Sequence, residues 1–267
     1  MRSNDFFNVP LENFSCSKGQ VDLPIQYFDT SLFMGLYLVA SDAVKDTLLS
    51  QAMKPVILPG GKTLVGIIAF EYRDTSIGSY NEVGLAALCV PKHVENPLFS
   101  LADIFKPSNS RDLGFFIIDL PVTTEIALAA GKEYWNYPKF VAQIPLEYRA
   151  DYVNFSVRDP NGSQNIMSMK GDFQLGVSLP VFDLLTYTNH TSGPSISDGS
   201  GSTQLKTLIR TKGDLRYYMY HDVTLEIGNS THAMAKNLRK LDLDGKRPFV
   251  LAESHDFLSL LHKGVPV

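Results

Sequence analysis

One lysine stands inside the densest aromatic cluster of the sequence, Gly131-Lys132-Glu133-Tyr134-Trp135-Asn136-Tyr137-Pro138-Lys139-Phe140. Aromatic residues flank Lys139 on both sides, and no acidic residue lies within three residues on its C-terminal side. Desolvation disfavours the charged form of a lysine, and a neutral lysine can attack a ketone to form a Schiff base. Pro138 restricts the backbone just before Lys139, which suits a nucleophile that must be held in place. The alternative is that Lys139 lays its stem on the aromatic rings and keeps its amine in water.

A second candidate is Glu82, which stands just before an apolar run at residues 85–90. A carboxylate at the end of a strand is more often solvated, because glutamate is rarely buried without a partner. It can instead face a pocket, where a perturbed acid takes part in proton transfer. The local sequence leaves both interpretations open.

The elements that would position these residues are mostly strands. Apolar runs at residues 32–39, 63–70, 85–90 and 113–120 are rich in strand-forming residues and predict strands buried on both faces. Thr123 or Thr124 can cap a helix that begins at Glu125 and ends before Pro138, and this helix delivers Lys139. Gly131 is expected to weaken that helix.

The remaining patterns predict a single β-dominated domain over residues 1–267. Asn161-Gly162, between two alternating runs, indicates a hairpin, because Asn-Gly readily adopts the positive φ of a tight turn. Residues 189–204 are almost without apolar side chains and predict a long polar loop, and a helix is predicted from Ser254 to Gly264. Many strands and few helices are typical of an α+β fold built as a barrel or as a pair of packed sheets.

Composition excludes several classes of function. The net charge of −4 argues against nucleic acid as a partner, because phosphate binding requires a basic face. The two cysteines, Cys16 and Cys89, do not make a disulfide framework, and the histidines show no ligand spacing for a metal. Residues 1–10 hold no apolar run long enough for a signal peptide, and nowhere do about 18 apolar residues run together to span a membrane. We therefore expect a soluble cytoplasmic protein without a cofactor, a metal or a membrane partner.

Two segments together resemble the acetoacetate decarboxylase superfamily. The first holds Asp74-Thr75-Ser76, Gly78, Tyr80 and Glu82-Val83-Gly84, and the second holds Ala129-Ala130-Gly131-Lys132-Glu133 and Tyr137-Pro138-Lys139. The similarity extends from about Tyr27 to the C-terminus. It implies that Lys139 is the Schiff-base lysine and Glu82 the acid of the pocket. It also implies a closed β-barrel or cone around an apolar cavity, and a homo-oligomer.

The sequence departs from the decarboxylase pattern at charged positions. The family has a second lysine directly after the nucleophile, where this chain has Phe140. An arginine and a second acid of the family pocket correspond to the vicinity of Thr30 and of Ile68. The pocket is therefore expected to carry less charge than that of a decarboxylase, so desolvation alone would have to activate Lys139.

The resemblance implies a Schiff-base lyase that acts on a small β-keto acid or a related ketone. Lys139 and Glu82 are the candidate catalytic residues, and Tyr80, Trp135, Tyr137 and Phe140 the candidate substrate-binding residues. Two alternatives are a Schiff-base aldolase or dehydratase of the same superfamily, and a catalytically silent protein that binds a hydrophobic ligand.

Overall fold

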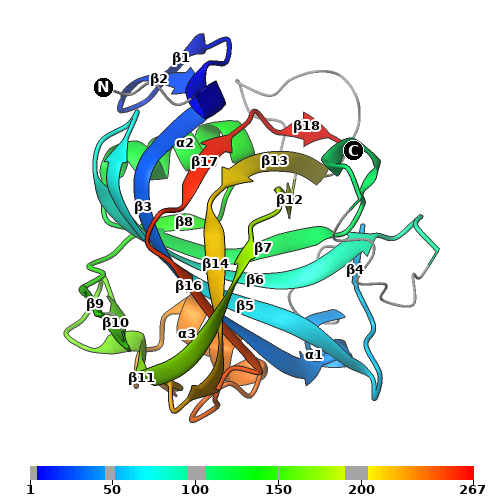
Figure 1. Ribbon diagram of the computed structural model, residues 1–267, viewed down its shortest axis with the longest axis vertical. Coiled ribbons are helices and arrows are strands. Elements are labelled where there is room, and N and C mark those ends of the chain that lie inside the picture. The colour runs from blue at the N-terminus through cyan, green and yellow to red at the C-terminus, as the bar shows by residue number, and fades with distance from the viewer. Residues whose placement is uncertain (1–4, 46–51, 96–105, 150, 190–203) are drawn as a thin grey trace.

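The computed structural model describes residues 5–45, 52–95, 106–149, 151–189 and 204–267. Strands dominate this part of the chain, and α2 and α3 lie towards opposite ends of the molecule (Figure 1). In chain order the elements are η1 (Asp5–Phe7), β1 (Glu12–Cys16), β2 (Gly19–Leu23), β3 (Ile25–Ala40), α1 (Ser41–Lys45), β4 (Met53–Pro55), β5 (Lys62–Thr75), β6 (Tyr80–Pro91), η3 (Ser108–Ser110), β7 (Gly114–Val122), α2 (Glu125–Trp135), β8 (Lys139–Val141), β9 (Leu146–Arg149), β10 (Tyr152–Arg158), β11 (Asn165–Pro180), β12 (Leu184–Asn189), β13 (Gln204–Lys212), β14 (Asp214–His221), β15 (Thr224–Ile227), α3 (Ala233–Lys240), β16 (Val250–Ser254), β17 (Leu258–Leu261) and β18 (Val265–Pro266).

The described strands include a closed barrel of seven. Its order is β17-β13-β12-β7-β6-β5-β3, and it closes where β17 pairs with β3. Neighbouring barrel strands are antiparallel except β12 and β7, which are parallel. Closure pairs both edges of the sheet, so no edge of the barrel is left with unpaired backbone groups. This architecture confirms the prediction of a β-dominated fold with a barrel.

A second layer packs on the outside of the barrel. From β3 the sheet continues through β16, β14, β11, β10 and β9 (Figure 1). The main core lies between this second layer, α3 and the outer face of β3, β5 and β6. Here Phe33, Ile67 and Leu85 of the barrel pack against Phe155 and Met169 of the second layer. A barrel and packed sheets, left as alternatives by the sequence, are thus both present.

The barrel and the outer layer together explain why the sequences of four strands are continuously apolar. The runs at 32–39, 63–70 and 85–90 lie within β3, β5 and β6, and the run at 113–120 lies in β7 except for Leu113, which precedes the strand. Alternate residues of a strand point to opposite faces. On β6, Leu85 packs in the core outside the barrel, whereas Ala86 lines a cavity inside it. Both faces are therefore covered by apolar groups.

The predicted hairpin is confirmed, but its turn is built differently from the expectation. Residues 159–164 connect β10 to β11, and neither Asn161 nor Gly162 has a positive φ. The carboxylate of Asp159 instead accepts the Asn161 N–H at 2.8 Å, and the Gly162 N–H donates to the Asp159 carbonyl at 3.3 Å. An aspartate that bonds the backbone two residues on is an Asx turn.

The prediction of a helix from Ser254 was wrong. This segment ends β16 and then forms β17, whose Leu261 pairs with Ile25 of β3 and with Ile209 of β13. Leu260 and Leu261 are both buried, so their apolar run reflects a strand covered on two faces rather than a helix face. The helix near the C-terminus is α3, which the sequence analysis did not predict.

The predicted helix from Glu125 is confirmed, whereas the predicted polar loop at 189–204 can be compared with the structure only at its ends. Helix α2 begins at Glu125 as predicted and passes through Gly131 to Trp135 without interruption. Most of the predicted loop at 189–204 lies outside the described residues. Asn189 and Gln204 are the ends of β12 and β13, where they pair with each other.

Candidate active site

Lys139 is held by the end of α2 and by β7. Asn136 ends the helix in the left-handed conformation (φ 48°), and its N–H donates to the Lys132 carbonyl, while the Tyr137 N–H donates to the Gly131 carbonyl, each at 3.1 Å. Asparagine is among the residues that adopt this conformation most readily. The Lys139 N–H then donates to the Tyr137 carbonyl at 2.7 Å across Pro138. Lys139 opens β8, where it pairs with Leu120 of β7. The backbone of Lys139 is thus fixed on both sides.

Gly131 lies against the side chain of Lys139. A Cβ atom at Gly131 would lie 2.4 Å from Cδ and 2.5 Å from Cε of Lys139. The stem of the lysine therefore runs over the bare backbone of α2, in space that no other residue type leaves open. From the sequence alone Gly131 was expected only to weaken the helix, because the contact joins residues eight positions apart that the turn at Asn136 brings together.

The amine of Lys139 meets Glu82 inside the barrel. Nζ donates to Oε2 of Glu82 at 2.7 Å, and the side chains of Lys139 and Glu82 are 5% and 9% exposed. Glu82 lies on β6, opposite Phe70 of β5 and Val122 of β7. Two charges withdrawn from water stabilise each other only as a pair, so removing either one leaves an uncompensated buried group. The structure therefore places the two predicted catalytic residues in direct contact.

Tyrosine hydroxyls surround this pair. Tyr27 and Tyr80 join their hydroxyls at 3.1 Å, and the Tyr137 hydroxyl bonds the Thr186 hydroxyl at 2.8 Å. Burial raises the pKa of Tyr27, Tyr72 and Tyr137 well above the usual value for tyrosine, and the charge of Glu82 acts in the same direction. These hydroxyls therefore stay protonated at neutral pH and can donate hydrogen bonds to a ligand oxygen.

The pair lies in a cavity of about 600 Å³ that is lined mainly by barrel strands and also by Leu215 and Tyr217 of β14 and Val250 of β16. Its lining is almost wholly apolar, and the charged residues in it are Glu82, Lys139, Arg111 and Asp183. The apolar side chains come from successive barrel strands: Leu32, Met34, Leu36 and Leu38 of β3, Leu64, Ile68 and Phe70 of β5, Ala86 and Leu88 of β6, and Phe115, Ile117 and Leu120 of β7. A largely apolar cavity with a few convergent polar groups is typical of a small-molecule pocket.

The predicted substrate-binding residues differ in their relation to this cavity. Tyr137 lines it, whereas Tyr80, Trp135 and Phe140 are not among the lining residues. Trp135 stacks behind Tyr137, with ring centroids 6.0 Å apart, and its Nε1 donates to the His262 carbonyl at 2.8 Å.

Tyr80 and Phe140 lie outside the lining for different reasons. The Tyr80 ring is 5.9 Å from the Lys139 amine and supports Tyr27 from behind. Phe140 follows Lys139 on β8, so its side chain points to the other face, where its ring centroid lies 4.3 Å from that of His232.

Other lining residues were not identified from the sequence. Tyr27, Tyr72 and Thr186 come from β3, β5 and β12. Tyr27 and Thr186 are far from both motifs along the chain, whereas Tyr72 lies two residues before Asp74 of the first motif. The signal that could have found Tyr27 and Tyr72 is the alternation of their strands, once one face is known to be interior. Of the two residues near which the resemblance places charged groups of the family pocket, Ile68 lines the cavity and Thr30 does not. Neither provides a charge in this chain.

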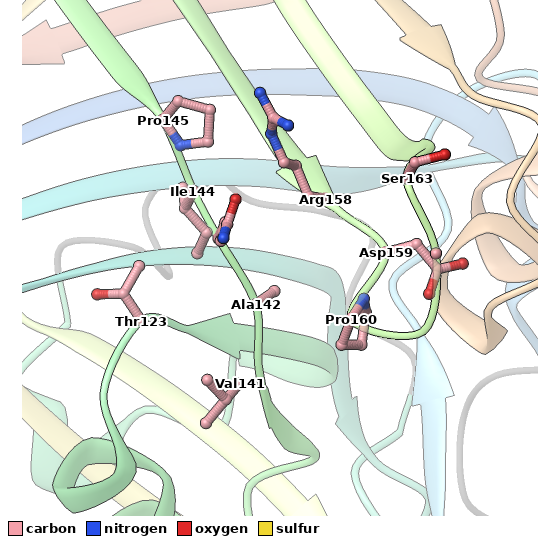
Figure 2. Close-up of a pocket in the computed structure, with 11 residues that line it drawn as sticks. Thr123, Val141, Ala142, Ile144, Pro145, Arg158, Asp159, Pro160 and Ser163 are labelled. Carbon is pink, nitrogen blue, oxygen red and sulfur yellow. The ribbon is translucent and has the colours of Figure 1, made fainter.

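A second, more open cleft of about 670 Å³ lies outside the barrel. It runs between the segment Val141–Pro145 and the hairpin of Arg158, Asp159 and Ser163 (Figure 2). The Ser230 hydroxyl and the Asn161 N–H donate to Asp159 and hold the pKa of this carboxyl below its usual value. Asp159 is therefore engaged in the structure of its hairpin.

The described residues lack two other kinds of feature. Those residues hold no group of three or more histidine, cysteine, aspartate or glutamate side chains placed to bind a metal ion. No helix among them is long and apolar enough to cross a membrane.

Comparisons with known proteins agree with the fold. The family model for acetoacetate decarboxylase (ADC) matches residues 13–256. A comparison with curated proteins finds no match.

Among solved structures, acetoacetate decarboxylase from Legionella pneumophila has a TM-score of 0.61 at 16% identity, over 91% of this chain and 87% of that one. The enduracididine biosynthesis enzyme MppR complexed with pyruvate has a TM-score of 0.60 at 9% identity, over 94% and 93% of the two chains. MppR complexed with the condensation product of pyruvate and imidazole 4-carboxaldehyde has a TM-score of 0.56 at 10% identity, over 92% and 90%. Identities this low establish a common fold and no more.

Proposed function

Because the chain belongs to the acetoacetate decarboxylase family, we propose that it is a Schiff-base lyase whose nucleophile is Lys139. The observation that carries this proposal is the buried contact of 2.7 Å between the Lys139 amine and Glu82 in an apolar cavity. A lysine nucleophile requires a group that removes its proton, a site that excludes water, and room for a carbonyl compound. All three requirements are met at Lys139.

The reaction follows from the groups present. The Glu82 carboxylate takes a proton from the Lys139 amine, which attacks the keto carbon of a 3-oxo acid, and loss of water leaves a protonated imine. The bond to the carboxylate breaks, carbon dioxide leaves, and the electron pair moves to the imine nitrogen to give an enamine. A proton then returns to carbon, and water releases the ketone. In sum, a 3-oxo carboxylate and a proton give a ketone and carbon dioxide.

The hydroxyls near the pair have a role in this scheme. Tyr27, Tyr72 and Tyr137 line the cavity beside Glu82 and Lys139. As neutral donors at the buried end of the cavity, they can orient the keto oxygen before attack. Tyr137 is itself held by its bond to Thr186, so its donor is in place before the substrate arrives.

A second candidate is a Schiff-base aldolase or dehydratase. The observation that favours it is the low charge around Lys139: the apolar Ile68 lines the cavity near the place where the resemblance puts a second acid, and Phe140 points away. Without a further cation, nothing beside Lys139 selects a free carboxylate. MppR, which shares the fold, is complexed in one structure with the condensation product of pyruvate and an aldehyde. The same imine supports both reactions, so the two candidates differ only in the bond that breaks.

Borohydride trapping tests the proposal. The protein is incubated with 3-oxo acids, 2-oxo acids and simple ketones, reduced with borohydride, and analysed by intact mass and peptide mapping. We expect an adduct on Lys139, and none in Lys139→Arg, because a guanidinium stays protonated and cannot attack. Carbon dioxide release identifies a decarboxylase, and a condensation product or loss of water identifies the alternative. A protein that binds ketones without any adduct would be a silent binding protein.

A further inference from the structure

The reactive pair lies at one end of the cavity, and the cavity opens at the other. Lys139 and Glu82 are buried near the start of β6, beside α2. At the far end of the same cavity, Leu38 is 41% exposed and Phe249 is 68% exposed. In Figure 1, α2 and α1, which adjoin these two ends, lie on opposite sides of the barrel. A ligand therefore enters past apolar side chains and reaches the lysine with its leading end.

Strand register gives the distance between the two ends. On β6 the lining runs from Glu82 to Leu88, and on β3 it runs from Leu32 to Leu38. Six residues of strand span about 20 Å at ~3.3 Å per residue. The cavity is therefore a tube many times longer than a keto group, with the chemistry confined to its closed end.

The walls of the tube are apolar over this length. Beyond Glu82 the lining positions of β6 are Gly84, Ala86 and Leu88, so this wall offers no polar side chain to a ligand. The charged groups towards the open end are Arg111, whose guanidinium donates to the Asp183 carbonyl, and the Asp183 carboxylate, which accepts the Thr211 N–H at 2.9 Å. A ligand that fills the tube thus has one polar end and an apolar body.

The volume also exceeds what a small keto acid can fill. About 600 Å³ lies within the range of ~300–1,000 Å³ for pockets that enclose drug-sized ligands. A molecule such as acetoacetate or pyruvate would occupy the space next to Lys139 and leave the rest empty. Such a molecule would make no contact with the rest of the apolar wall. It would therefore lack the binding energy that contacts remote from the reacting group can supply.

We propose that the substrate is a carbonyl compound with a long apolar chain, in the first instance a long-chain 3-oxo acid. Its keto group lies at Lys139 and its alkyl chain runs along β6 towards Leu38. This inference rests on the proposed function for the reaction, in which a long-chain 3-oxo carboxylate and a proton give a long-chain methyl ketone and carbon dioxide. What this inference adds to the proposed function is the length of the alkyl chain that the substrate carries.

The kinetic test is a chain-length series of 3-oxo acids that begins with acetoacetate. We expect kcat/KM to rise about fourfold for each methylene until the chain reaches the opening, which corresponds to ~0.8 kcal/mol per buried methylene. Ala86→Leu narrows the middle of the tube, so the ratio of kcat/KM for long over short acids should fall towards one. The matched control is Ala40→Leu, the same change at an exposed position of β3 outside the cavity. Equal kcat/KM along the series, or an unchanged ratio in Ala86→Leu, would overturn the inference.

A binding test separates this inference from the imine chemistry. The double variant Lys139→Met, Glu82→Gln cannot form an imine and leaves no lone buried charge. Calorimetry with methyl ketones of increasing chain length should show affinity that rises about fourfold per methylene, and Ala86→Leu in this background should remove the rise. Tight binding of long ketones without borohydride trapping in the wild type would refute the proposed function and retain the apolar ligand class. Trapping of short ketones with no dependence of affinity on chain length would refute the inference alone.

Discussion

Replacing Gly131 by alanine tests whether the bare backbone of α2 positions the nucleophile. The new Cβ would lie 2.4 Å from Cδ of Lys139, whereas ordinary contacts begin at 3.4 Å. The stem of Lys139 must therefore move by about 1 Å, which carries the amine away from Glu82. A misplacement of about 1 Å at a reacting group can cost ~100-fold in rate. The same change should stabilise helix α2, because alanine is favoured over glycine by ~1 kcal/mol in a helix interior.

The expected result for Gly131→Ala is opposite effects on stability and chemistry. The rate of borohydride trapping should fall by about 100-fold, whereas the midpoint of urea unfolding should stay the same or rise. Ala129→Gly, two residues earlier in α2, is the matched control: it should lower stability by ~1 kcal/mol and keep the trapping rate. Wild-type trapping in Gly131→Ala would refute the positioning role, and so would a parallel loss of stability and rate.

Three further predictions concern buried groups. Lys139→Met and Glu82→Gln should each lower the free energy of unfolding by up to ~3–5 kcal/mol, and the double variant should lose less than the sum, as measured in a denaturant double-mutant cycle. Burial raises the pKa of Asp119 to about 6, above the unfolded value of 3.8, so its contribution to stability is complete below pH 3.8 and is lost as pH rises through about 6. This contribution to the free energy of unfolding is ~3 kcal/mol. Asp119→Asn should flatten the curve of unfolding free energy against pH between about 3.8 and 6. An unchanged curve would show that another group causes the loss of stability. Phe140→Lys should leave the pH profile of imine trapping unchanged, because the side chain faces His232 rather than the cavity, and a shift of the profile towards lower pH would contradict that placement.

Much of the local structure could be predicted, because short-range chemistry decides it. The apolar runs of β3, β5, β6 and β7, the start of α2 at Glu125 and the hairpin between β10 and β11 are set by composition and turn residues. The segment after Ser254 was mispredicted, because adjacent buried leucines satisfy a helix face and a doubly covered strand equally well. Its pairing with β3 and β13 decided between the two.

The candidate site also combines features that the sequence could predict with features that only the tertiary structure shows. The sequence by itself determined that Lys139 follows a proline in an aromatic segment, that Glu82 stands at a strand end, and that both match one family's motifs. Only the tertiary structure decided that these residues, 57 positions apart, meet at 2.7 Å. It also decided that Phe140 faces away and that the tube beyond Glu82 is long and apolar. The physical reason is that alternation along a strand separates two faces without saying which one becomes the interior, and closure of the barrel by β17 and β3 makes that choice.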